Sequence, residues 1–270
     1  MTCTLGIDVG TTYTKAVVLD QADRVVGRAL QPTGFKLTAI AEQVAAQATA
    51  DAGLPREAIG YVVATGFGRH QVAFADVHVT DLTAAARGAT LLFPGTRTIL
   101  DVGGQTMKAS RLGERATVRS FRLNDKCAAG TGRFLGAASS ALDIPLDELG
   151  PTALRGDRPV KISTTCTVFA ESEVLSWLGK GKKIEDILLG VHQSIAARST
   201  GLLRRVGIEA EVTFTGGVAR NVAMIEALAR SLGLPVNVSD ESHYVGALGA
   251  ALFALDHIRA ARTPARQEAS

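Results

Sequence analysis

Two stretches of this chain repeat one pattern, and the repeat limits the folds open to it. TCTLGIDVGTTYTKA occupies residues 2–16 and TRTILDVGGQTMKA occupies residues 96–109. In both copies an apolar run delivers an aspartate, a polar turn with glycine follows, and a lysine opens a second run. Two short apolar runs joined in this way are typical of paired strands. We therefore expect two similar lobes, each built on such a strand pair.

Around the repeats, the spacing of apolar residues alternates between the period of a strand and that of a helix. The first repeat continues through RVVGRAL as a strand meander, and the second continues through the strands around ATVRSFRLN. Asp81 opens one helical pattern and can cap it. Helices are expected at residues 37–53, 81–93, 184–207 and 219–233, after both Cys127 and Cys166, and from Tyr244 onward; further strands are expected at residues 61–66, 211–217 and 235–239. This order predicts lobes at residues 1–95 and 96–258, followed by a polar tail at residues 259–270.

Composition excludes several classes of protein. The net charge is +3, and the basic residues are scattered apart from LGKGKK at residues 178–183, so no nucleic-acid or membrane-surface footprint is present. Asp8 interrupts the first apolar run, and no run reaches the roughly 18 apolar residues that span a bilayer. We expect a cytoplasmic protein with reduced thiols.

Each repeat places a carboxylate at the end of a strand and a polar turn directly after it. Backbone N–H groups and hydroxyls of such a turn can face phosphate oxygens, and the carboxylate can hold magnesium, usually through water. In the first repeat these residues are Asp8, Gly10, Thr11, Thr12, Tyr13, Thr14 and Lys15. Taken alone, this copy could equally well be an ordinary hairpin turn. The second copy is what favours a phosphate-binding turn over that alternative.

The second repeat supplies a matching turn, and a third loop follows later in the chain. The members of the second turn are Asp101, Gly103, Gly104 and Gln105. In FTGGVARN, residues 214–221, Gly216 and Gly217 end a strand and precede a helix, which suits close approach of a nucleotide. Three loops in this order resemble the actin, Hsp70 and sugar-kinase ATPase superfamily. The resemblance implies a two-lobed α/β fold with duplicated mixed-sheet domains, in which the first two loops hold the phosphates of ATP with Mg²⁺ and the third lies against the adenosine.

Two of the three cysteines have similar neighbours. Cys127 lies in NDKCAAGTGRF and Cys166 in STTCTVFAESEV, each just before a helix expected to begin near Thr131 or Gly132 and near Val168. The positive end of a helix dipole favours a thiolate or an anionic cluster. An inert buried thiol is the alternative for either residue taken alone.

Other thiol chemistry lacks its partners in this chain. A nucleophilic cysteine needs a basic partner, yet the five histidines show no pairing spacing, and zinc needs four ligands in one chain. A Cys₄ iron–sulfur cluster needs four thiolates, and a twofold dimer with Cys127 and Cys166 from each chain supplies four. Cys3 precedes the first strand without nearby glycine, and we assign it no role.

The motifs LGIDVGTTYTK, DVGGQTMK, NDKCAAGTGRF, STTCTVFAESEV and TGGVARN resemble those of the activator component of 2-hydroxyacyl-CoA dehydratases. The wider family includes the ATPase subunits of benzoyl-CoA reductase. The resemblance implies a homodimer with one [4Fe–4S] cluster at the subunit interface. It also implies ATP-driven transfer of one low-potential electron, received from reduced ferredoxin or flavodoxin, to an iron–sulfur acyl-CoA dehydratase or reductase. Arg220 and Tyr244 are nucleotide contacts on the same resemblance.

Within this interpretation Asp8 and Asp101 hold magnesium and Lys15 neutralises phosphate charge. Gln105 either orients the attacking water or only hydrogen-bonds its own loop. A small-molecule kinase of the same superfamily is the alternative, and it predicts no iron and a substrate-binding aspartate. A non-enzymatic, actin-like ATP-binding module is a third possibility, without redox chemistry.

Overall fold

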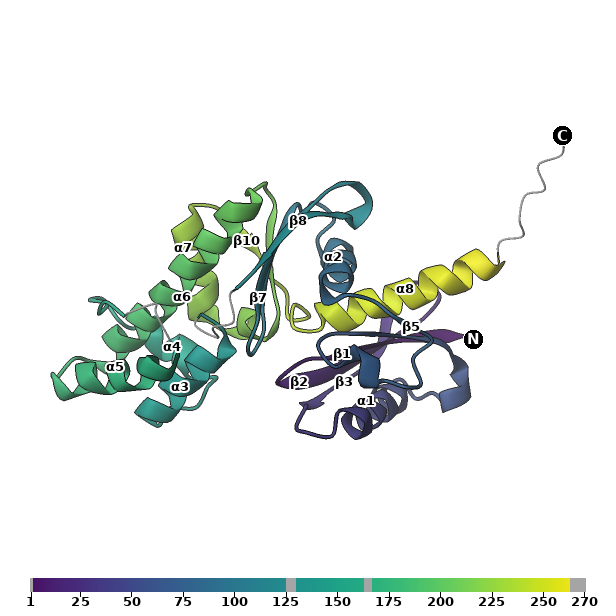
Figure 1. Cartoon of the computed structure of the whole chain (residues 1–270), viewed down its shortest axis with the longest axis horizontal. Coiled ribbons are helices and arrows are strands. Elements are labelled where there is room, and N and C mark those ends of the chain that lie inside the picture. Colours follow the sequence, from purple (N-terminus) through teal and green to yellow (C-terminus); the bar gives the residue numbers. More distant parts are fainter. Residues whose placement is uncertain (1, 125–129, 163–166, 263–270) are drawn as a thin grey trace. The chain divides into compact units, whose positions relative to one another are not determined.

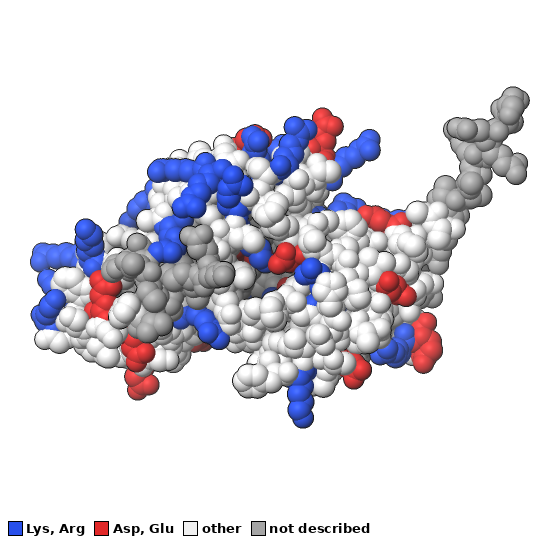
Figure 2. Space-filling model, viewed as in Figure 1, with Lys and Arg blue, Asp and Glu red and all other residues white. Residues whose placement is uncertain are grey.

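The computed structural model describes residues 2–124, 130–162 and 167–262. It divides into two compact units, which are described separately (Figure 1). Residues 2–88 with residues 244–262 form the first unit, and Ala89–His243 form the second. On the face drawn in Figure 2, Lys and Arg gather mainly over the second unit, with Asp and Glu among them. Within the described residues, no helix combines the length and apolar character needed to cross a bilayer.

The first unit is a five-stranded mixed sheet between helices. Its order is β3-β2-β1-β4-β5; β1 pairs antiparallel with β2, which pairs antiparallel with β3, while β4 lies parallel to β1 and β5 parallel to β4. The strands are β1 (Cys3–Val9), β2 (Tyr13–Leu19), β3 (Val25–Pro32), β4 (Ile59–Thr65) and β5 (Val77–His78). The helices are α1 (Leu37–Asp51), α8 (Val245–Arg262) and α2 (Asp81–Leu92), whose residues 89–92 fall in the second unit, with 3₁₀ turns η1 (Arg56–Ala58) and η2 (Arg69–Gln71).

Alternation along β1 explains why helices cover both faces of the first sheet. Leu5, Ile7 and Val9 pack into one buried cluster with apolar residues of α1. Gly6 lies on the opposite face, where a Cβ would overlap the α8 backbone. Figure 1 accordingly shows α1 and α8 on opposite sides of these strands.

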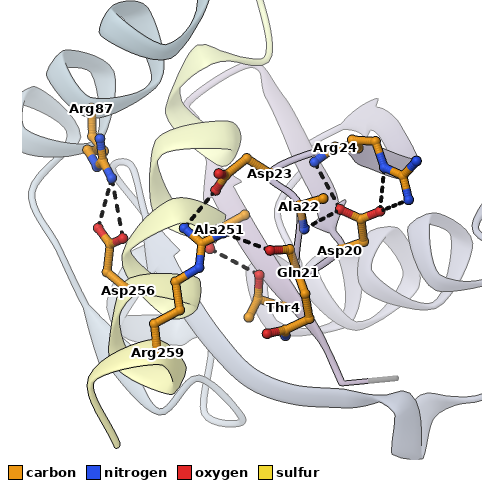
Figure 3. Close-up of polar contacts among 10 residues, drawn as sticks. All are labelled: Thr4, Asp20, Gln21, Ala22, Asp23, Arg24, Arg87, Ala251, Asp256 and Arg259. Carbon is orange, nitrogen blue, oxygen red and sulfur yellow. Dashed lines mark hydrogen bonds and ion pairs between the residues drawn. The ribbon is translucent and has the colours of Figure 1, made fainter. Parts of the chain in front are cut away.

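Hydrogen bonds and an ion pair join the last helix, α8, to residues near the start of the chain (Figure 3). The Thr4 hydroxyl donates to the Ala251 carbonyl at 3.1 Å. Arg259 donates to the Gln21 carbonyl at 2.7 Å and pairs with Asp23 at 3.1 Å. Residues 244–258, expected in the second lobe, therefore belong with the first. The helix also continues to Arg262, into the expected tail, of which residues 263–270 lie outside the described residues.

The second unit repeats the sheet of the first and carries more helices. Its order is β10-β9-β6-β7-β8, with β6–β7 and β7–β8 antiparallel and β6–β9 and β9–β10 parallel. The strands are β6 (Thr98–Val102), β7 (Met107–Leu112), β8 (Val118–Leu123), β9 (Val212–Thr215) and β10 (Val236–Asn237); the helices are α3 (Gly132–Leu142), α4 (Leu149–Ala153), α5 (Thr167–Gly179), α6 (Ile184–Val206) and α7 (Val222–Leu232), with 3₁₀ turns η3 (Glu114–Ala116) and η4 (Gly217–Arg220).

Read from the edge formed by β8, the second sheet has the same strand connections as the first. The duplication expected from the repeat is thus confirmed in both sheets. Helix α3 begins at the expected Gly132, and α5 begins one residue before the expected Val168. Asp81 is not the cap of α2: the Thr80 hydroxyl accepts from the Thr83 N–H at 3.2 Å, so Asp81 is the first helical residue. The short β5 and α4 were not predicted.

Candidate functional site

The first Asp–Lys hairpin, residues 8–15, joins β1 to β2 in the first unit. Its register places Asp8 opposite Lys15, and Lys15 Nζ lies 3.2 Å from Asp8 Oδ2. The turn closes with the Gly10 N–H donating to the Tyr13 carbonyl at 3.2 Å. The two side chains are 17% and 13% exposed, so both remain within reach of a solvent-borne ligand.

Glycines leave room around the Asp8 carboxylate. Gly66 follows β4 with φ +88°, and a Cβ there would overlap Asp8 Oδ1 and the backbone of Val9. A Cβ at Gly246 would lie 2.9 Å from Asp8 Oδ2. Helix α8 begins at Val245, so its positive dipole end lies beside this carboxylate.

The threonines of the first hairpin have different positions. Thr12 and Tyr13 are exposed and Thr11 is half-buried. The Thr14 hydroxyl is buried 3.0 Å from the Thr33 hydroxyl, which donates to the Gly10 carbonyl at 2.8 Å. Thr14, predicted to face phosphate, instead supports the turn from beneath.

The second Asp–Lys hairpin, residues 101–108, joins β6 to β7 in the second unit. Asp101 is again opposite Lys108, with Nζ 3.9 Å from Asp101 Oδ1. The Gly103 N–H donates to the Thr106 carbonyl at 2.8 Å. Unlike Asp8, Asp101 also accepts a hydrogen bond from the Thr215 hydroxyl, at 3.0 Å to Oδ2.

The third loop, residues 214–221, lies next to the second hairpin. Strand β9 runs parallel to β6 with Asp101 opposite Thr215. Gly216 has φ +89°, and a Cβ there would overlap the Val102 carbonyl, so only glycine lets the loop pass this closely. Beyond η4, the Asn221 side chain caps α7 by accepting from the Met224 N–H at 3.1 Å.

The predicted residues divide between the two units. Asp8, Gly10, Thr11, Thr12, Tyr13, Thr14, Lys15 and Tyr244 belong to the first unit, and Asp101, Gly103, Gly104, Gln105, Gly216, Gly217 and Arg220 belong to the second. Tyr244 is half-buried with the Arg28 guanidinium 5.8 Å from its ring centre, whereas Arg220 is exposed. Cys127 and Cys166 lie outside the described residues.

Sequence reasoning missed the residues that complete each aspartate's surroundings. Lys108, Thr215 and Gly66 had no assigned role, although each contacts or adjoins an aspartate. Two signals could have identified them: the lysine follows the aspartate by seven positions in both repeats, and each parallel strand ends in Thr-Gly. Both are repeat relationships, which a single motif does not reveal.

The donor atoms fit a magnesium-bound phosphate chain. Each hairpin offers one accessible carboxylate, one lysine and a glycine turn, which together suit a metal shared with phosphate oxygens. Across residues 2–124, 130–162 and 167–262, no three His, Cys, Asp or Glu side chains gather as a metal site on their own. Cys3 is buried in β1, and burial together with the nearby Asp20 raises the pKa of its thiol, which suits a packing role.

A family model described as the BadF/BadG/BcrA/BcrD ATPase family matches residues 5–254. The 2-hydroxyisocaproyl-CoA dehydratase activator of Clostridioides difficile is 41% identical over 256 residues, 95% of this chain and 96% of that protein. The (R)-2-hydroxyglutaryl-CoA dehydratase activating ATPase of Acidaminococcus fermentans is 40% identical over 252 residues, 93% and 96% of the two proteins. One of the subunits of benzoyl-CoA reductase from Thauera aromatica is 34% identical, with 100% and 99% covered. These matches agree with the resemblance in the motifs.

Solved structures show the same likeness. The activator of the 2-hydroxyisocaproyl-CoA dehydratase from Clostridium difficile with bound ADPNP superposes with a TM-score of 0.92 at 39% identity, covering 99% of this chain and 100% of that one. A ROK family glucokinase from Streptomyces griseus reaches 0.61 at 14% identity, covering 94% and 99%. The second likeness concerns the fold alone, and it confirms the expected sugar-kinase-like architecture.

Proposed function

Because this chain belongs to the BadF/BadG/BcrA/BcrD ATPase family, we propose that it is an ATPase that activates an acyl-CoA dehydratase or a related acyl-CoA reductase. The observation that carries this proposal is the repeated Asp–Lys hairpin, with one lysine beside each aspartate. A solved relative that superposes with a TM-score of 0.92 contains bound ADPNP, which supports nucleotide binding on the same fold. We place the protein in the cytoplasm, where thiols stay reduced.

The hairpins have distinct tasks in this proposal. Asp8 and Asp101 hold Mg²⁺, largely through water, because their carboxylates are accessible and only partly neutralised. Lys15 and the N–H groups of the first turn neutralise phosphate charge. Gln105 orients the attacking water, and the third loop with Gly216 and Gly217 lies along the nucleoside. Tyr244 and Arg220 are further nucleotide contacts.

The redox part of the proposal depends on cysteines outside the described residues. Cys127 and Cys166 from each of two chains supply the four thiolates of one [4Fe–4S] cluster. The described helices α3 and α5 begin within five residues of these cysteines. When bound, the cluster carries one low-potential electron to an iron–sulfur partner, and reduced ferredoxin or flavodoxin replaces it. The nucleotide residues lie on separate loops, so cluster loss leaves ATP binding intact.

Iron content and electron transfer test this function together. Anaerobically purified protein should contain about two irons per chain, because one four-iron cluster is shared by two chains. Cys127→Ser and Cys166→Ser should each lose iron and ATP-dependent electron transfer to a 2-hydroxyacyl-CoA dehydratase while still binding ATP. Cys3→Ser is the matched control and should resemble wild type. A Cys127 variant that keeps its full iron and activity would favour the kinase, whereas four irons on a monomer would contradict a cluster shared between two chains.

A further inference from the structure

The second hairpin is joined to the beginning of helix α3. The Thr131 hydroxyl and the Arg133 N–H both donate to the Gly104 carbonyl at 2.9 Å, and the Gly132 N–H donates to the Gly103 carbonyl at 2.9 Å. The first N–H groups of a helix normally lack a partner within the helix. Here two of them are used by the hairpin, so this helix end is tied to the loop.

Glycines bring these two segments into direct backbone contact. A Cβ at Gly132 would lie 3.3 Å from both the Gly103 oxygen and the Gly104 Cα. Gly130 has φ +87°, and a Cβ there would lie 2.8 Å from Arg198 Cδ. Helix start and loop are therefore in direct backbone contact, held by these three hydrogen bonds.

The same hairpin also holds the end of β8. The Asn124 N–H donates to the Met107 carbonyl at 2.8 Å, and the Asn124 Oδ1 accepts from the Met107 N–H at 2.9 Å. The Asn124 side-chain amide also donates to the Gln105 carbonyl, at 3.4 Å. Residues 103–107 therefore contact the described residues on both sides of positions 125–129.

One side-chain contact across this junction involves the proposed water-orienting residue. The Gln105 amide oxygen accepts from Arg133 Nε at 3.2 Å and from Arg133 Nη2 at 2.9 Å. The reverse orientation of the amide would set its N–H groups against those of the guanidinium, so hydrogen bonding decides the assignment. Both of these guanidinium N–H groups converge on the one amide oxygen of Gln105.

Occupation of this oxygen matters for catalysis. A glutamine orients an attacking water by accepting a hydrogen bond from it with the amide oxygen. In this structure that oxygen is engaged by a cation, and only the amide N–H groups remain to interact with a ligand. Since Arg133 is the second residue of α3, its position follows the helix.

We propose that Arg133 is a positioning residue that restrains Gln105 until helix α3 moves. This inference rests on the proposed ATPase function. While the helix stays on the second hairpin, hydrolysis is slow because the Gln105 oxygen is occupied. Displacement of α3, as on docking of the iron–sulfur partner, withdraws the guanidinium and frees the amide. Hydrolysis is thereby coupled to the position of helix α3.

The test is a double-mutant cycle on the anaerobically purified protein with magnesium-ATP and no partner. Arg133→Met keeps the length of the side chain and removes its donors. We expect it to raise kcat about 3- to 10-fold, the range for losing a charged but solvent-exposed hydrogen bond, with KM for ATP unchanged. Arg133→Lys should fall between Met and wild type. In a Gln105→Ala background, Arg133→Met should have no effect on kcat, because the restrained group is gone.

Controls separate restraint from general damage. Arg122→Met removes an exposed arginine of β8 that donates to the Phe121 carbonyl, and it should leave kcat unchanged. Thermal unfolding and ATP binding verify that each variant is folded. An unchanged or lower kcat in Arg133→Met, or an equal rise in the Gln105→Ala background, would overturn the restraint while leaving the ATPase proposal standing. A wild-type protein that binds ATP without hydrolysing it would overturn both.

Discussion

The turn of the first Asp–Lys hairpin is supported by its own sheet, whereas the turn of the second is supported by a helix as well. In both, a buried threonine hydroxyl donates to a glycine carbonyl: Thr33 to Gly10 at 2.8 Å and Thr131 to Gly104 at 2.9 Å. Thr33 directly follows β3, the edge of the same meander. Thr131 directly precedes α3. The same support thus comes from different elements.

This difference indicates that the two duplicated units differ in how their hairpins are connected to the rest of the protein. A hairpin supported by its own sheet holds a ligand in a fixed geometry. A hairpin joined to a helix holds the ligand equally well and also responds to that helix. In the proposed function the two aspartates should therefore be equivalent in binding, while coupling to helix α3 is expected only for the second hairpin.

The largest effect tests the equivalence of the aspartates. Asp8→Asn and Asp101→Asn should each lower kcat for ATP hydrolysis by about 100-fold or more, because each removes a charge that acts on the metal and phosphates. Steady-state hydrolysis across magnesium concentrations measures this, with iron content as the check that the cluster site is intact. If one variant retains full activity, its aspartate does not hold the metal of the proposed ATPase.

An intermediate effect uses the matched threonines that end the parallel strands. Thr215 donates to Asp101, whereas the buried Thr65 hydroxyl has no partner among the described residues. Thr215→Val should lower the free energy of unfolding by about 1 kcal/mol, since it removes a hydrogen bond to a carboxylate that water can still reach. Thr65→Val, of the same shape, should be neutral or slightly stabilising. Calorimetry compares the two, and equal losses would mean that the hydroxyls have equivalent partners.

The smallest effect appears only in acid and should be confined to the second unit. His192 is fully buried in α6, and burial lowers the pKa of its imidazole although Nδ1 donates to the Leu188 carbonyl at 2.7 Å. The unfolded chain binds a proton more readily, so stability decreases as pH falls through about 6.5, the unfolded value. Trp177, the single tryptophan, lies in the second unit and reports its unfolding by fluorescence.

The control for this prediction is His192→Leu, which cannot titrate. Its urea midpoint should change less than that of wild type between pH 7.5 and 5.5, about one unit either side of the unfolded pKa. A wild-type midpoint that rises in acid would contradict the burial argument.

Sequence periodicity predicted both hairpins and the strands of both sheets except the two-residue β5. The repeat predicted two units, and the position of Asp8 and Asp101 at strand ends followed from short apolar runs that stop at glycine. These signals are local, because each strand carries its own alternation and its own turn. The start of α3 at Gly132 was predicted for the same reason.

Contacts between distant segments could not be predicted in this way. Nothing local distinguishes Thr14, which faces Thr33 beneath the turn, from Thr12 on its exposed side. The pairing of Gln105 with Arg133 depends on α3 folding back onto the hairpin, which no spacing encodes. Tertiary packing decides both.

The position of α8 has a consequence for the order in which the protein folds during synthesis. Thr4 and Ala251, bonded to each other, lie 247 positions apart, whereas the second unit is one continuous segment. Contacts of such high sequence separation form late, because the ribosome must first release nearly the whole chain. The second unit can thus complete its core while β1 still exposes the face that α8 will cover. A chaperone that recognises apolar strands would find its target in β4, near the beginning of this nascent chain, where Val63 awaits Ala250 and Ala254 of α8, and not at the growing end.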